Sequence, residues 1–123
     1  MLCRYKKAYE KIAMGLLSFM PDHKDVKKLQ ETICKYNSDP NWQLFLWKQA
    51  EDYIGLVGVE TKDSQWIVRH ISVDPSHRGE GLGIEMIRQL SKMDLCGSIT
   101  SDSLTEPFIQ KCLTMLEGAD NEY

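Results

Sequence analysis

The chain has 123 residues, of which 42% are hydrophobic and 27% are charged, with a formal net charge of −3. This length predicts a single domain over residues 1–123, and this composition excludes general disorder and a fibrous fold. The small negative charge, with no basic cluster among aromatic residues, argues against a nucleic-acid partner.

The first forty residues predict a short strand followed by two helices. Residues 1–7 are a plausible first strand, and apolar residues at helical spacing predict helices over about Tyr9–Met20 and about Lys24–Tyr36. Lysines before the apolar run Ile12–Met20 imitate a secretory signal. Because this run is short and ends without a cleavage site, a helix that faces the core is favoured.

The middle of the chain has the features of strands. The segments Trp42–Gln49, Tyr53–Thr61 and Gln65–Val73 are rich in aromatic and β-branched residues, and short polar turns separate them. Such short links predict an antiparallel meander. No segment is long enough to span a membrane, and the four cysteines have no zinc-ligand spacing, so we expect a cytoplasmic protein with reduced thiols and no metal.

Helical spacing returns after Gly83, and a short strand over Gly97–Ser101 and a last helix from near Thr105 to Gly118 complete the pattern. The predicted order is β-α-α-β-β-β-α-β-α. In the second half of the chain, only the connection from Val73 to Gly97 is long enough to join parallel strands. The predicted fold class is therefore α/β (α+β), a mixed, mostly antiparallel sheet flanked by helices.

The stretch Ile71–Met86, ISVDPSHRGEGLGIEM, places three of the eight glycines within five residues. Between a strand and a helix, glycines leave successive N–H groups and the positive helix end facing one point, which is typical of a phosphate site. A glycine-rich surface turn is the alternative. The stretch is neither a Walker A loop, since it lacks Gly-Lys-Ser/Thr, nor a G-x-G-x-x-G loop.

Arg78, Gly81 and Gly83 instead match Gln/Arg-x-x-Gly-x-Gly/Ala, and the stretch resembles motif A of the GCN5-related N-acetyltransferase (GNAT) family. The predicted element order also resembles this family, except that the family's usual last two strands are missing. The resemblance implies a GNAT fold and transfer of an acetyl group from acetyl-CoA to a primary amine of a small metabolite or a protein. Within the family, the chain is similar to acetyltransferase-like proteins of riboflavin operons, which implies a link to riboflavin biosynthesis.

The resemblance also implies how coenzyme A binds. The backbone of Ile71 and Val73 would pair with the pantetheine arm as an added strand does. The pyrophosphate would bind the loop amides, which belong to Arg78, Gly79, Glu80, Gly81, Leu82 and Gly83.

Direct attack of an amine on the thioester requires a base, for which Glu60 and His70 are the candidates. The alternatives are an exposed carboxylate at a strand end and a histidine that is hydrogen-bonded within the sheet. The family's final-helix tyrosine falls on Thr114 and its asparagine on Pro107, so the usual general acid is missing.

These departures leave a second hypothesis open, a CoA-binding sensor or regulatory module with little turnover. The acceptor cannot be named from the sequence. The edge of the strand Gly97–Ser101 is expected to pair with a second copy of the chain or to be solvated.

Overall fold

The structure is a computed structural model, and it describes residues 1–93, 98–102, 105–107 and 109–110. Five strands form one sheet in the order β1-β2-β3-β4-β5. They are β1 (Leu2–Arg4), β2 (Trp42–Gln49), β3 (Asp52–Lys62), β4 (Gln65–Val73) and β5 (Ser98–Ser101). Neighbouring strands are antiparallel except β4 and β5, which are parallel. The prediction of a mixed, mostly antiparallel sheet is confirmed.

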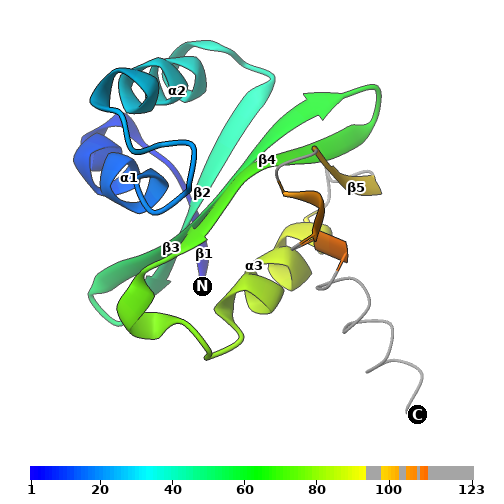
Figure 1. The fold of residues 1–123 in the computed structure, drawn as a ribbon. Coiled ribbons are helices and arrows are strands. Elements are labelled where there is room, and N and C mark those ends of the chain that lie inside the picture. The colour runs from blue at the N-terminus through cyan, green and yellow to red at the C-terminus, as the bar shows by residue number, and fades with distance from the viewer. Residues whose placement is uncertain (94–97, 103–104, 108, 111–123) are drawn as a thin grey trace.

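Among the residues that the structure describes, three complete α-helices flank the sheet. They are α1 (Glu10–Leu17), α2 (Val26–Ser38) and α3 (Leu82–Ser91). The helices α1 and α2 cover one face, and α3 lies on the other (Figure 1). Residues 106, 107, 109 and 110 are helical as well, but most of the predicted last helix, including Thr114 and Gly118, lies outside the described residues.

Helix α1 ends earlier than the sequence predicts. The N–H groups of Phe19 and Met20 bond three residues back, to Leu16 and Leu17, so the last turn tightens before Pro21. Helix α2 begins after Asp25, whose side chain accepts a hydrogen bond from the N–H of Lys27. None of the described helices is long and apolar enough to cross a membrane.

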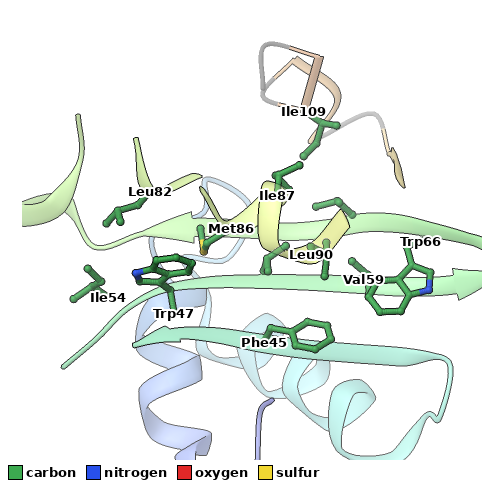
Figure 2. Close-up of a cluster of buried hydrophobic side chains, with 12 residues drawn as sticks. Phe45, Trp47, Ile54, Val59, Trp66, Leu82, Met86, Ile87, Leu90 and Ile109 are labelled. Atoms are coloured by element: carbon green, nitrogen blue, oxygen red, sulfur yellow. The ribbon is translucent and has the colours of Figure 1, made fainter. Parts of the chain in front are cut away.

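Each face of the sheet has its own apolar core. On the α3 face, Figure 2 shows Met86 and Leu90 between the helix and the strands, above Trp47 and Phe45. On the opposite face, side chains from α1 and α2 pack on Leu44, Leu46 and Leu56. Alternate residues of β2 and β3 therefore belong to different cores, which is why these strands read as long apolar runs.

Strand β4 is the element that positions the site. Its pairing with β5 extends only from Gln65 to Val68, so Arg69–Val73 continues beyond the last β5 partner. Thr105 Oγ1 donates a hydrogen bond of 2.6 Å to the carbonyl oxygen of Val68, which is where that pairing ends. The β5 side of β4 is therefore open from Arg69 onward among the residues that the structure describes.

A β-bulge lies at the same point. Val59 pairs with Val68 and Gly58 pairs with His70, so Arg69 is an extra residue of β4. Before the bulge, Val68 packs in the α3 core, whereas after it His70 contacts Tyr36 of α2. The bulge thus brings Arg69 and His70 to the same face of the sheet as adjacent side chains.

Candidate active site

The conformation of the loop before α3 favours glycine at two positions. Gly79 has φ of 85° and Gly81 has φ of 75°, in the left-handed region that residues with a Cβ rarely adopt. An added Cβ would meet no other atom within 4 Å at either position. The backbone conformation, rather than crowding, therefore explains these glycines.

This loop presents a run of free backbone N–H groups. Those of residues 79–84 donate no hydrogen bond to any residue that the structure describes, and the first bond into α3 runs from Glu85 to Gly81. Gly81 caps α3 without a side chain that could occupy these donors. Together with the helix dipole, the loop and helix end form a surface suited to an anion.

The predicted donor residues lie next to one another. The Ile71 and Val73 side chains are partly buried against the α3 core, and their main chain lies at the open edge of β4. Arg78 Nε lies 3.4 Å from the carbonyl oxygen of Val73, which links the loop to the open edge of β4. Leu82 and Gly83 are buried in the first turn of α3, and Glu80 contacts His77.

A pocket of about 630 Å³ opens over the bulge, on the face of the sheet that α1 and α2 cover. Its walls come from the α1–α2 connection, α2, the ends of β2 and β3, the middle of β4 and the segment after β5. The residues that line it are Asp22, His23, Lys28, Glu31, Thr32, Lys35, Trp42, Glu60, Arg69, His70 and Asp102. The volume suits a small ligand, and the charged lining suits a polar one.

Glu60, one of the two predicted bases, forms an ion pair in this pocket. Arg69 donates to its Oε1 from Nη2 at 2.6 Å and from Nε at 3.1 Å. Arg69 Nη1 lies 3.4 Å from Asp102 Oδ2, and the hydrogen bond to Glu60 is the main cause that raises the pKa of Arg69. Both bonds to Glu60 use Oε1, so Oε2 accepts none from the described residues and stays available for a proton.

His70, the other predicted base, is buried and hydrogen-bonded. Its Nδ1 lies 2.6 Å from the Tyr36 hydroxyl oxygen. Burial, followed by the nearby His23, lowers the pKa of His70 to about 4, so the imidazole is neutral at pH 7. Burial also raises the pKa of Tyr36 well above 10, and its hydroxyl stays protonated.

A second histidine supports this arrangement from the α1–α2 connection. His23 is 1% exposed, and its ring nitrogens lie 2.7 Å from Asp22 Oδ1 and 2.8 Å from Thr32 Oγ1. The rings of His23 and His70 meet edge to face with centroids 4.9 Å apart. Burial, the largest single influence, opposes the charged form of Asp22, but the hydrogen bond and the charge of His23 act together with smaller contributions to lower the pKa of that carboxyl.

Replacing Gly58 with alanine is expected to destabilise the fold by about 1–3 kcal/mol, as overpacking of a core does. An added Cβ would lie 2.0 Å from the Tyr36 hydroxyl oxygen, so the ring would have to move away from His70. Gly15→Ala is the matched control, because its Cβ meets no atom within 4 Å and alanine favours helices. Urea unfolding measures both free energies; equal stability of the two variants would contradict this packing.

Because burial depresses the pKa of His70, stability should fall as the pH falls from 6.5 toward 4. In this window the unfolded imidazole binds a proton that the folded one does not. The loss should reach about 3 kcal/mol at pH 4, at 1.36 kcal/mol for each pKa unit. The measurement is urea unfolding of the wild type and of His70→Gln at several pH values. The difference in free energy of unfolding between the wild type and His70→Gln should shrink by this amount as the pH falls. Parallel dependences of the two free energies on pH would disprove the effect.

The structure brings Glu60 and His70 to one pocket and places the predicted donor residues at the loop and open edge beside it. Sequence reasoning missed four residues of the pocket, Tyr36, His23, Thr32 and Arg69. Arg69 was not predictable, because the bulge that presents it has no signature in the alternating pattern of β4. Asp74 accepts hydrogen bonds from Ser76, and Asp102 accepts one from the Thr105 N–H and also faces Arg69.

Comparison with known proteins agrees with these features. The model of the acetyltransferase (GNAT) family matches residues 9–94. The chain is 50% identical over 113 residues to an uncharacterised N-acetyltransferase of Bacillus methanolicus, named for its place in the lysA 3′ region. That match covers 91% of this chain and 94% of the relative.

Solved structures share the fold at low identity. An aminoglycoside N-acetyltransferase in complex with CoA superposes with a TM-score of 0.68 at 14% identity, over 94% of this chain and 84% of that one. A transcriptional regulator from Bacillus halodurans superposes with a TM-score of 0.67 at 12% identity, over 94% of this chain and 90% of that one. These likenesses cover most of the chain and show its fold.

Proposed function

Since the chain belongs to the acetyltransferase (GNAT) family, we propose that it transfers an acetyl group from acetyl-CoA to a primary amine by direct attack. One observation carries the proposal. The free N–H groups of residues 79–84 adjoin the open edge of β4, and that edge leads to the bulge where Glu60 and His70 line a pocket. A donor along the open edge of β4 and an acceptor in the pocket can therefore meet at the bulge.

Acetyl-CoA is the proposed donor substrate. Its pyrophosphate would bind the free amides of Gly79–Gly83 and the positive end of α3, whereas the predicted Arg78 N–H already donates to the carbonyl oxygen of Pro75. Its pantetheine arm carries amides, which can pair with the backbone of Ile71 and Val73 as an extra strand would. The thioester would then lie at Arg69, where the bulge interrupts the ladder and leaves main-chain groups of the extra residue without a partner strand.

The amine acceptor would occupy the pocket on the α1 and α2 face. Attack by the amine nitrogen forms the new C–N bond, the carbonyl π electrons move onto oxygen, and collapse expels the CoA thiolate. The amine must lose one proton, and Glu60 Oε2 and His70, which both line the pocket, are the predicted acceptors for it. A thiolate with an ordinary pKa near 8.5 can leave and take its proton from water.

A screen of primary amines with a free-thiol readout tests this proposal. We expect release of CoA that depends on both acetyl-CoA and one class of amine, with a product that is heavier by one acetyl group. A link to riboflavin biosynthesis, which we also propose, places amine intermediates of that pathway in the screen. Tight CoA binding without turnover on any acceptor would favour the alternative, a CoA-binding sensor.

Self-association through β5 is a further proposal. This strand is the last in the described sheet, it pairs only with β4 there, and its side chains include Ser98 and Thr100. A second copy could pair along the other edge. Light scattering at high micromolar protein, with and without CoA, should then give a dimer mass, whereas a monomer mass throughout would refute the pairing.

A further inference from the structure

The hydrogen bond between Tyr36 and His70 determines which ring nitrogen of His70 carries the proton. A neutral imidazole has one N–H, and a protonated tyrosine has one O–H. Tyr36 Oη has no second hydrogen-bond partner among the described residues. If His70 Nδ1 were the donor, the buried Tyr36 hydrogen would lack an acceptor, at a cost of about 1–3 kcal/mol. Tyr36 therefore donates to Nδ1, and the imidazole proton is on Nε2.

The Nε2–H group faces the pocket. Within the part of the chain that the structure describes, every buried side-chain nitrogen or oxygen has a hydrogen-bond partner. Nε2 of His70 has no such partner, since the hydrogen bond to Tyr36 uses Nδ1. Nε2 is therefore accessible, and the accessible part of His70 lines the pocket. The edge-to-face contact with His23 restrains rotation of the ring.

We infer that His70 is a neutral hydrogen-bond donor rather than the base, and that its Nε2–H polarises the acetyl carbonyl oxygen during the transfer. Tyr36 is the positioning residue that fixes this tautomer. The inference rests on the proposed acetyl transfer. When the amine attacks, the electron pair that moves onto the carbonyl oxygen is stabilised by Nε2–H. The proton of the amine then goes to Glu60, directly or through a water.

Burial first, and His23 second, keep His70 neutral in spite of two nearby carboxylates. Lys28 of α2 disfavours the imidazolium, whereas Asp22 and Asp102 favour it, and burial outweighs both carboxylates. Tyr36, which is hydrogen-bonded to Nδ1 of His70, offers that nitrogen a proton rather than a lone pair. A group that already accepts at one nitrogen and carries a proton on the other has no free lone pair for the proton of an amine.

The test is ¹⁵N NMR of the histidine rings in the full chain, which has three histidines. His70→Gln identifies the His70 signals. At pH 7 we expect a neutral ring with the proton on Nε2, and a mixture of tautomers in Tyr36→Phe. A ring protonated on Nδ1, or on both nitrogens, would overturn the inference. If Tyr36→Phe does not fold, the wild-type spectrum decides alone.

Ligand titration distinguishes this inference from the proposed function. Acetyl-CoA should shift the Nε2–H signal more than CoA does, because only acetyl-CoA carries the thioester carbonyl oxygen that would accept the hydrogen bond from Nε2–H. Equal shifts would refute the donor role even if an amine is acetylated. Absence of turnover with every amine would refute the proposed function even if the shifts differ.

Kinetics provide an independent readout. Glutamine retains an N–H donor but cannot act as a base, so His70→Gln should retain at least tenfold more kcat than His70→Leu, with the same KM for acetyl-CoA. Tyr36→Phe should lower kcat with little change in that KM. If His70 is the base, the glutamine and leucine variants will lose the same activity, which would contradict the inference.

Discussion

Gly81→Asp is expected to abolish acetyl-CoA binding while the protein stays folded. The residue caps α3 with φ of 75°, and a Cβ there meets no atom within 4 Å, so aspartate fits the space. Its carboxylate would, however, occupy the free N–H groups and repel the pyrophosphate. In the wild type, acetyl-CoA at 100 times its dissociation constant should stabilise the fold by about 2.7 kcal/mol. The rise in melting temperature should vanish in Gly81→Asp.

Gly81→Asn is the matched control. Asparagine has the same shape as aspartate, tolerates the left-handed conformation and carries no charge. It should retain most of the rise in melting temperature, so the difference between the two variants measures the charge alone. Equal stabilisation of both variants by acetyl-CoA would show that the loop is not part of the donor site.

Glu60→Gln should lower kcat by about 10²- to 10⁴-fold, the usual effect of a lost general base. The melting-temperature rise with acetyl-CoA should be unchanged, because Glu60 lies on β3 and not in the loop before α3. Glutamine can still accept a hydrogen bond from Arg69, which also contacts Asp102, so the local structure should survive. Glu51→Gln, at an exposed position between β2 and β3, is the control.

The dependence of kcat on pH distinguishes two roles of Glu60, that of a general base and that of a charge that only positions Arg69. Loss of a base should remove the acidic limb of the dependence of kcat on pH, whereas loss of an ion pair should lower kcat equally at every pH. A uniform loss would reassign Glu60 to a positioning role.

The strands were predictable because their chemistry is local. The bounds of β2 and β4 agree with the sequence analysis, since β2 is rich in aromatic residues and leucine, β4 is rich in β-branched residues, and polar segments flank both. The glycines before α3 were equally clear, because Gly79 and Gly81 are needed for conformations that the chain adopts within a few residues.

The chemistry of His70 was not predictable in this way. Its partner Tyr36 is 34 positions away and was read as part of an apolar stripe. The bulge at Arg69 reverses which side chains of β4 face each core, but the buried and less buried residues still alternate along the strand. Neither feature leaves a periodic signal, so the pocket depends on tertiary contacts that single-sequence patterns do not contain.

Calorimetric titration of the wild-type protein with acetyl-CoA tests the central claim most directly, because binding of this donor precedes every other step. The free N–H groups of residues 79–84 and the open edge of β4 predict saturable binding at one site per chain, with competition by CoA. No detectable binding at millimolar acetyl-CoA would contradict the account.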